Sequence, residues 1–260
     1  MEPGRRRLDR SALAAELAAA GFVAADEEAD ELLACAEGDA GRLEAVVERR
    51  LAGEPLAWIT GDAVFCGRRL RVDPGVYVPR PHTEPVAQRA VERCPPEGVA
   101  VDLCTGCGAV AATIAAAHPR ARVLATDLDE RAVACARANG VDAHQGDLFD
   151  PLPAGLEGAV DVLVAVVPYV PTAELDLLQR DTFAFETPLA YDGGADGADL
   201  LRRVAAGAPR LLHSGGVLLL ELGRGQPGLL GPDLERHGFA GIAVIMDEDG
   251  DVRGLEAALV

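Results

Sequence analysis

The chain has 260 residues, of which 49% are hydrophobic, and its formal net charge is −18 at pH 7. This length and composition allow one large domain with a sizeable core and a smaller lobe. The negative charge argues against nucleic acid as a partner and against an anionic membrane surface, because both are bound through basic residues. No apolar run reaches the roughly 18 residues that a membrane-spanning helix needs. The basic N-terminus is not followed by the apolar segment of a secretory signal, so we expect a cytoplasmic protein.

The first part of the chain predicts two small units. Residues 1–53 carry helical patterns of alanine and leucine separated by glycines, which indicates an N-terminal helical lobe. Residues 54–81 alternate apolar and polar residues and are interrupted at Gly61 and at Pro74-Gly75. This pattern predicts two or three strands in hairpins that connect the lobe to the next domain. Neither unit shows a pattern that indicates chemistry.

Residues 82–260 alternate strand-like and helix-like segments. Apolar strands such as GVAVDLC and ARVLATD are each followed by a helical pattern, such as GAVAATIAAAHP after the first of them. This alternation predicts an α/β domain of the Rossmann-like type, in which helices cover both faces of a mostly parallel sheet. Ligands of such sheets bind at the carboxyl ends of the strands, so the residues that follow each strand are candidates for the functional site.

The first of these strands runs into the glycine-rich turn DLCTGCG (102–108). Glycines ahead of a helix let the backbone approach a ligand closely, and the helix N-terminus offers free N–H groups. Thr105, Gly106 and Gly108 are therefore candidates for contacts with a cofactor. Asp102 places a carboxylate where the pyrophosphate of a dinucleotide would lie, which disfavours a dinucleotide and suits a cationic ligand.

Acidic residues also follow the next two strands. Asp127 stands about 20 residues after the glycine turn, where a carboxylate can accept hydrogen bonds from both hydroxyls of a ribose. Asp147 follows the third strand, and we include Leu128 and Leu148, the neighbours of these two aspartates, in the predicted cofactor site. Aspartate is also a favourable helix N-cap, which gives each carboxylate a structural explanation on its own. The three strand ends together predict a pocket for an adenosine with a charged, phosphate-free tail, and S-adenosylmethionine fits this description.

Two of the six cysteines, Cys104 and Cys107, form a C-x-x-C pair. Such a pair can serve redox chemistry or half a zinc site. The chain has no second pair of this kind, and both residues lie in the glycine-rich turn. We therefore predict no metal site and interpret the cysteines as small buried thiols in a reducing compartment.

Seven segments of the chain resemble, in this order, the HemK/PrmC-type protein-glutamine methyltransferases. They are GEPLAWITG (53–61), RVDPGVYVPRPHTE (71–84), VDLCTGCGAVA (101–111), ATDLD (125–129), DVLVAVVPYVP (161–171), FETPLAYDGGADGADLLRR (185–203) and LELGRGQ (220–226). The resemblance implies a helical N-terminal lobe, a β-hairpin connector and a seven-stranded, S-adenosylmethionine-dependent methyltransferase domain. Members of the family methylate the side-chain amide of the glutamine in a Gly-Gly-Gln tripeptide of peptide-chain release factors, which leaves S-adenosylhomocysteine as the second product.

The same resemblance implies roles for the pocket residues. Gly106 and Gly108 would hold the methionine part of the cofactor. Asp127 would bind the ribose, and Asp147 would lie at the adenine.

The acceptor motif of the family is altered in this chain. Where the family has Asn-Pro-Pro-Tyr, this chain has Val166, Val167, Pro168 and Tyr169, which we predict as the catalytic residues, with Val166 also at the cofactor. The family's Asn and the carbonyl that follows it grip the amide and aim its nitrogen at the methyl group. Val166 can neither donate nor accept a hydrogen bond. The Val167 carbonyl, held extended by Pro168, could still accept one, and Tyr169 could still cover a flat group.

His82 is a second departure, because the family usually has Glu or Asp at this position. A histidine near the pocket could act as a base at neutral pH. The structural alternative is an exposed loop residue.

The predicted cofactor residues match the family (the cofactor half of the site), whereas residues 166–169, which we call the acceptor tip, are altered. This combination is compatible with three hypotheses. The first is a protein-glutamine methyltransferase with a diverged acceptor site, whose partner is a release factor or another glutamine-containing protein. The alternative is an N-methyltransferase of a small-molecule amine or amide, such as an amino acid or a specialised metabolite. A further alternative is a protein that binds S-adenosylmethionine without catalysis.

Overall fold

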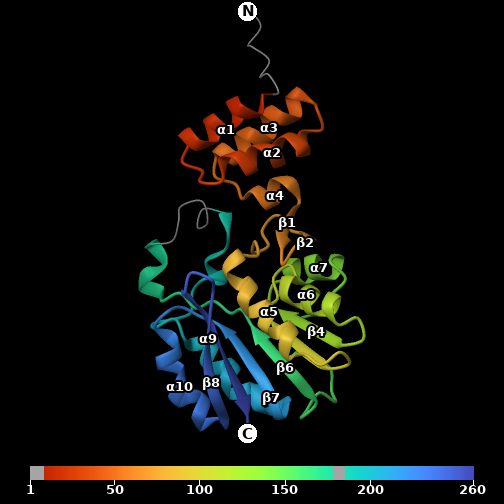
Figure 1. Cartoon of the computed structure of the whole chain (residues 1–260), viewed down its shortest axis with the longest axis vertical. Helices are drawn as coiled ribbons and strands as arrows, with labels where there is room; N and C mark the ends of the chain where they lie inside the picture. Colours follow the sequence, from red (N-terminus) through yellow and green to blue (C-terminus); the bar gives the residue numbers. More distant parts are fainter. Residues whose placement is uncertain (1–8, 178–184) are drawn as a thin grey trace, which may run out of the picture.

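The computed structural model describes residues 9–177 and 185–260. Its N-terminal part is a lobe of three helices that stands apart from the rest of the molecule (Figure 1): α1 (Arg10–Ala19), α2 (Ala25–Ala36) and α3 (Ala40–Leu51). The apolar sides of these helices share a core of their own, in which Leu17 and Leu32 are fully buried. Residues 1–8, with which the predicted lobe begins, lie outside the described residues.

The connector begins with a helix where the alternating apolar residues predicted a strand. This helix, α4 (Leu56–Thr60), ends at Gly61, which has a φ of 90°. The antiparallel hairpin follows as β1 (Asp62–Phe65) and β2 (Arg68–Arg71). Trp58 of α4 is buried, and its indole nitrogen donates a hydrogen bond to the carbonyl of Val76 (2.9 Å). In a segment of this length the spacing of apolar residues does not distinguish a helix from a strand. The tertiary packing of Trp58 therefore determines that the segment is helical.

The rest of the chain is built on a seven-stranded, mostly parallel sheet, as predicted. The strand order is β5-β4-β3-β6-β7-β9-β8. The strands are β3 (Val99–Leu103), β4 (Arg122–Asp127), β5 (Asp142–Gln145), β6 (Val160–Ala165), β7 (Leu212–Glu221), β8 (Phe239–Met246) and β9 (Val252–Leu259). β9 pairs antiparallel with β7 and β8, and the other pairs are parallel. The strand order reverses at β3, which has β4 on one side and β6 on the other, and α/β sheets bind ligands at such a switch point.

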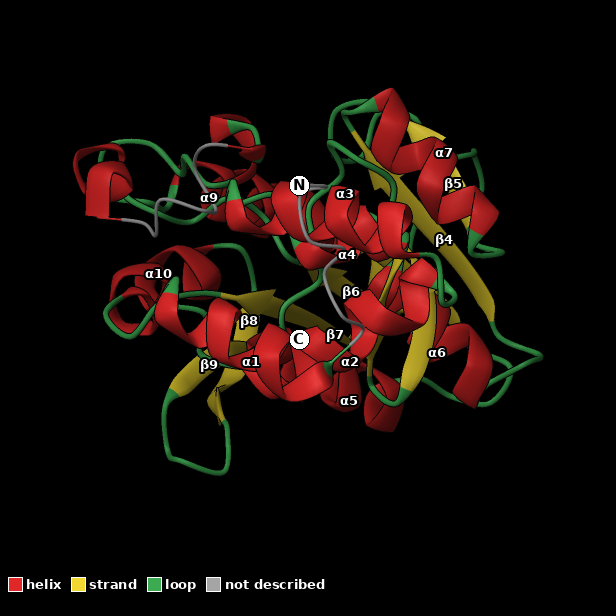
Figure 2. Ribbon diagram, turned by 90° about the horizontal axis from the view of Figure 1, so that it is seen from above, coloured by secondary structure: helices red, strands yellow, loops and turns green. Residues whose placement is uncertain are grey.

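Helices cover both faces of this sheet. They are α5 (Glu84–Arg93), α6 (Ala109–Ala117), α7 (Glu130–Ala138), α9 (Asp199–Gly207) and α10 (Gln226–Arg236). Seen from above, α5 lies on one side of the strands and α10 on the other (Figure 2). Along β6, Val162 and Val164 pack in the core with α5 and α6, whereas Leu163 and Ala165 pack in the core with α9 and α10. Burial on both faces explains why this strand is a continuous apolar run.

Short 3₁₀ helices lie in several of the connections: η1 (Pro81–Thr83), η2 (Thr172–Leu177), η3 (Pro188–Ala190) and η4 (Ala208–Arg210). Within residues 9–177 and 185–260, no helix has the length and apolar character needed to cross a membrane.

Candidate active site

A cavity of about 800 Å³ lies at the carboxyl ends of β3, β4, β6 and β7. Its lining contains every predicted site residue except Gly108: Asp102, Thr105, Gly106, Asp127, Leu128, Asp147, Leu148, Val166, Val167, Pro168 and Tyr169. The segment before η1, which includes Tyr77 and Arg80, and the segment at Tyr191 also line the cavity. One cavity therefore joins the three carboxylates to the altered acceptor tip.

Asp102 of β3 is buried in the wall of this cavity, with 1% of its surface exposed. Its Oδ2 accepts hydrogen bonds from the Thr105 hydroxyl (2.6 Å) and from the Ala111 amide (3.1 Å). Its Oδ1 has no hydrogen-bond partner among the described residues. Burial raises the pKa of this carboxyl to about 7. A buried acceptor without a partner fits a ligand that brings a positively charged donor.

The turn after β3 requires positive φ at Cys104 (58°), Gly106 (56°) and Gly108 (85°). The Gly106 amide donates to Oδ2 of Asp127 (2.8 Å), so it fixes that carboxylate and is not free for a ligand. Gly108 lies behind the turn, where a Cβ would approach Cγ2 of Val141 to 2.9 Å. Gly108 therefore lies outside the cavity lining, where it allows close packing, and its contact with the cofactor stays a prediction.

Asp127 ends β4 and points both carboxylate oxygens at backbone amides. Oδ1 accepts from the Asp129 amide (2.9 Å), and Oδ2 accepts from the Gly106 amide. Burial raises the pKa of Asp127 above its ordinary value, and these amides oppose the shift by stabilising the charged form. Each oxygen keeps a further lone pair, so the carboxylate can still accept two ribose hydroxyls.

The outer edge of the cavity is formed after β5. Asp147 is half exposed and is paired with Arg203 of α9 (2.7 Å). Leu148 is buried, and its carbonyl accepts a hydrogen bond from the Thr126 hydroxyl (2.8 Å). Leu128 is largely exposed. An apolar edge with one carboxylate is compatible with the flat face and the amino group of an adenine.

The acceptor tip follows β6 directly. The amide of Val166 donates to the carbonyl of Leu103 (3.4 Å), which ties the tip to the end of β3. Val167 is buried, and its carbonyl takes part in no hydrogen bond among the described residues. The hydroxyl of Tyr169 donates to Oε1 of Glu221 at the end of β7 (3.1 Å). The tip is thus held between two strands, while one backbone acceptor is left for a substrate.

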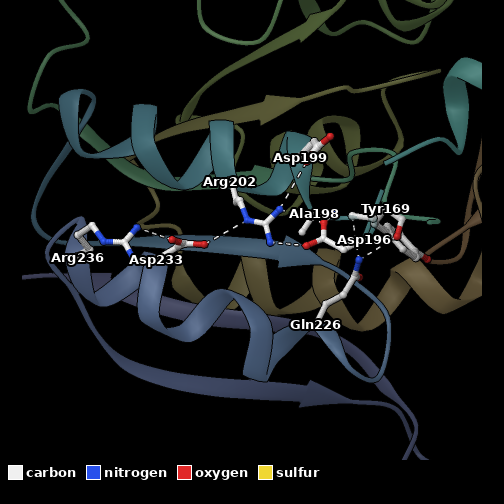
Figure 3. Close-up of polar contacts among 9 residues, drawn as sticks. Tyr169, Asp196, Ala198, Asp199, Arg202, Gln226, Asp233 and Arg236 are labelled. Atoms are coloured by element: carbon white, nitrogen blue, oxygen red, sulfur yellow. Dashed lines mark hydrogen bonds and ion pairs between the residues drawn. The ribbon is translucent and has the colours of Figure 1, made fainter. Parts of the chain in front are cut away.

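Gln226, at the start of α10, stabilises the tip by hydrogen bonds to its backbone (Figure 3). Its Nε2 donates to the carbonyls of Tyr169 and Gly197 (2.9 Å each), and its Oε1 accepts from the Gly223 amide (2.7 Å). This buried side chain therefore fixes three separate pieces of backbone.

Arg202 of α9 continues this support toward α10 (Figure 3). Its guanidinium pairs with Asp196 (2.6 Å), Asp233 (3.3 Å) and Asp199 (3.5 Å), and Asp233 also binds Arg236. Single ion pairs near the surface contribute little to stability. Together they join α9, α10 and the loop that contains Gly197.

Sequence reasoning gave no role to a polar cluster that closes the cavity beside the tip. Arg80 donates to Oε2 of Glu186 (2.6 Å) and to the hydroxyl of Tyr191 (3.1 Å), and Oε1 of Glu186 accepts from the Val78 amide (3.0 Å). The ring of Tyr77 packs edge-on against Tyr191, and burial raises the pKa of Tyr77 to about 12. The cluster joins segments that lie far apart in the chain, so no local pattern reveals it.

Comparisons with known proteins agree with this geometry. A sequence model of the methyltransferase small domain matches residues 64–154. The chain is 39% identical over 217 residues to the release factor glutamine methyltransferase of Neisseria gonorrhoeae, and the aligned region covers 80% of this chain and 78% of that protein. It is 40% identical over 192 residues to the 4-amino-L-phenylalanine/4-methylamino-L-phenylalanine methyltransferase of Streptomyces pristinaespiralis, with coverages of 68% and 64%. A solved ribosomal protein L11 methylase from Lactobacillus delbrueckii subsp. bulgaricus has a similar fold, with a TM-score of 0.50, 18% identity, and coverage of 76% of this chain and 89% of that one.

The sheet, its switch-point cavity and these matches define an S-adenosylmethionine-dependent methyltransferase of class I. The unpartnered oxygen of Asp102 and the carboxylate of Asp127 fit the charged amino group and the ribose of that cofactor. Within this class, the chain belongs to the release factor glutamine methyltransferase family. The resemblance found in the sequence and the predicted cofactor are confirmed.

The affinity for S-adenosylmethionine is expected to rise with pH because of Asp102. The pKa of its carboxyl, about 7, leaves the group mostly protonated at pH 6 and mostly ionised at pH 8. Only the ionised form attracts the positive charges of the cofactor, so we expect binding to tighten as the pH rises through this pKa. Calorimetric titration at several pH values measures this. In Asp102→Asn the binding should be weak and nearly independent of pH, and an equally steep dependence in that variant would assign the effect to another group.

Proposed function

We propose that this chain transfers the methyl group of S-adenosylmethionine to the side-chain amide nitrogen of a glutamine in a protein, with a peptide-chain release factor as its partner. The names of its relatives support the reaction and the partner. The observation that carries the proposal is the single cavity that contains both the cofactor carboxylates and the acceptor tip. Methyl transfer needs donor and acceptor held together in one such space. A reaction on a translation factor would take place in the cytoplasm.

The residues of the tip must compensate for a poor nucleophile. The lone pair of an amide nitrogen is delocalised into the carbonyl, so the nitrogen has to be aimed. S-adenosylmethionine, when bound, supplies a methyl group on a positively charged sulfur. The Val167 carbonyl can accept one N–H of the amide, and Tyr169 can cover its flat face. Val166 leaves a second polar group of the amide without a partner, which costs about 1–3 kcal/mol, equivalent to roughly 10- to 100-fold in rate.

A small-molecule amine is the second candidate acceptor, and Val166 is the observation that favours it. The lone pair of an amine is not delocalised into a carbonyl, so its nitrogen is a better nucleophile than that of an amide and needs no grip on a neighbouring carbonyl. An apolar lip at Val166 would also suit an aromatic or aliphatic substrate. The relative from Streptomyces pristinaespiralis is named for methylation of such an amine.

Restoring the amide side chain at position 166 distinguishes the two acceptors. Wild type and Val166→Asn are incubated with S-adenosylmethionine and either a purified bacterial release factor or 4-amino-L-phenylalanine, and mass spectrometry locates the added methyl group. We expect the wild type to methylate one glutamine of the release factor. The variant should do so roughly 10- to 100-fold faster, because the amide regains its partner.

Val244→Asn serves as the matched control, because Val244 is exposed on the edge strand β8, away from the cavity. It should leave both rates unchanged. Methylation of the amine alone, reduced by Val166→Asn, would replace the glutamine proposal with the small-molecule one. Tight cofactor binding without transfer to either acceptor would contradict both and favour a non-catalytic binding protein.

A further inference from the structure

His82 and Glu221 face each other at the acceptor end of the cavity, beside the tip. His82 lies in η1, and Glu221 is the last residue of β7. Both line the cavity together with Val166 and Tyr169. Nε2 of His82 lies 3.5 Å from Oε1 of Glu221, and the Tyr169 hydroxyl donates to the same oxygen (3.1 Å). The two side chains therefore form one polar group with the tyrosine of the tip.

Two atoms of this group are buried and have unused hydrogen-bonding capacity. The side chain of Glu221 is only 2% exposed, and its Oε2 has no hydrogen-bond partner among the described residues. The His82 ring is 36% exposed, but its Nε2 is turned inward, is buried and also has no hydrogen-bond partner in that part of the chain. Leaving a buried polar atom unpaired costs roughly 1–3 kcal/mol, so two such atoms on one cavity wall indicate a place for a ligand.

Burial keeps Tyr169 in its protonated state. Desolvation, followed by the charge of Glu221, raises the pKa of the Tyr169 hydroxyl far above its ordinary value. The hydroxyl therefore remains a donor to Oε1, and it cannot occupy Oε2, the other oxygen of Glu221. The carboxylate therefore has one oxygen bound to the tip and one buried oxygen with unused acceptor capacity.

We propose that Glu221 and His82 bind the acceptor nitrogen and take up the proton that it loses during methyl transfer. Oε2 of Glu221 and the Val167 carbonyl share one N–H, and Nε2 of His82 receives the proton of the other. The substrate is thus a nitrogen with two hydrogens, either a primary amide or a primary amine. This inference rests on the proposed methyl transfer, but it holds for both candidate acceptors.

The reaction balances with these groups alone. The lone pair of the acceptor nitrogen forms the new N–C bond, and the pair of the broken S–C bond stays on the sulfur of the cofactor. The electrons of the broken N–H bond return to nitrogen, and the proton passes to Nε2 of neutral His82. Glu221 stabilises the resulting imidazolium, and the exposed edge of the ring returns the proton to solvent. The pair thus supplies hydrogen-bonding groups that Val166 does not.

Single substitutions of His82 and Glu221 distinguish a role in proton transfer, which affects kcat, from a role in substrate binding, which affects KM. His82→Gln keeps a polar side chain of similar reach but cannot take up a proton, so we expect kcat to fall about 100-fold with KM changed less than about threefold. Glu221→Gln should both raise KM and lower kcat. The affinity for S-adenosylhomocysteine should remain at the wild-type value in both variants, which also reports on correct folding.

His213→Gln is the matched control, since His213 lies at the amino-terminal end of β7, where it pairs with Asp161 (3.1 Å) outside the cavity. It should leave kcat unchanged. A value of kcat in His82→Gln within about twofold of wild type would overturn the proton-transfer role, because a general base typically contributes 10²–10⁴-fold.

A second measurement does not depend on the identity of the acceptor. Protein labelled with ¹⁵N-histidine and saturated with S-adenosylhomocysteine is titrated with acetamide, a primary amide. We expect the ring resonances of His82 to shift in a saturable way, those of His213 to stay in place, and the His82 shift to vanish in Glu221→Gln. No shift of His82 would overturn the inference. A wild-type chain that methylates neither the release factor nor 4-amino-L-phenylalanine would contradict the proposed function, and the titration alone would then decide this inference.

Discussion

Asp127→Ala is expected to weaken the binding of S-adenosylmethionine by about 100-fold or more. The wild-type carboxylate is oriented by the amides of Gly106 and Asp129 before the cofactor arrives. Two ribose hydroxyls then find a charged acceptor, and each hydrogen bond to a charged group contributes roughly 1.5–3 kcal/mol. The alanine variant loses both bonds and also releases the glycine-rich turn that carries Gly106. Isothermal titration calorimetry with S-adenosylmethionine and with S-adenosylhomocysteine measures the effect.

Asp142→Ala is the control for that substitution. Asp142 is exposed at the amino-terminal end of β5, so the same chemical change there should leave the affinity unaltered. Unchanged affinity in Asp127→Ala would show that the ribose lies elsewhere. A loss of folding, detected by circular dichroism, would call for Asp127→Asn, which keeps one oxygen acceptor and should show an intermediate affinity.

Gly197→Ala is expected to disable the acceptor tip while leaving the cofactor half intact. Gly197 has a φ of 74°, and a Cβ at this position would lie 2.3 Å from the carbonyl oxygen of Tyr169 and 2.8 Å from Nε2 of Gln226. Neither atom can move freely, because Gln226 binds both backbone carbonyls at this point. The added methyl group must push the tip away from its position. We expect at least a tenfold loss of kcat, since small misplacements of reacting groups reduce rates strongly.

The cost of positive φ itself can be separated from this clash. Gly155 has a φ of 86°, and a Cβ there would meet nothing within 4 Å. Gly155→Ala should therefore lower the free energy of unfolding by roughly 1–2 kcal/mol without changing kcat. Gly197→Ala should lower it further, by about 1–3 kcal/mol of overpacking, while the affinity for S-adenosylhomocysteine changes little. Equal kcat values in the two variants would show that the tip does not depend on this support.

The cofactor half could be predicted from sequence because its residues are local to strand ends. Asp102, Asp127 and Asp147 each stand at or just after a strand, and the parallel pairing of β3, β4 and β5 brings these ends to one edge of the sheet. The alternation of strands and helices predicts the fold class, and the alignment of these aspartates with a glycine-rich turn predicts the kind of ligand. The role of Gly108 cannot be read from the sequence, because direct contact with a ligand and close packing both require a glycine.

The acceptor half could be predicted only in part. The tip at 166–169 was identified through a resemblance, but its supports come from other parts of the chain. Glu221 ends β7, Gln226 begins α10 and His82 lies in η1, so no spacing within one segment indicates that they meet the tip. Their hydrogen-bonding roles depend on tertiary contacts that a sequence pattern does not contain.

The central claim is that carboxylates at neighbouring strand ends hold a sulfonium nucleoside with its methyl group facing the altered tip. A crystal structure of this chain with S-adenosylhomocysteine tests it most directly. We predict both ribose hydroxyls within hydrogen-bonding distance of Asp127, the amino group at Oδ1 of Asp102, and the sulfur directed toward Val166. A nucleoside bound outside this cavity, or a cavity that takes up NAD and leaves S-adenosylhomocysteine in solution, would contradict the account.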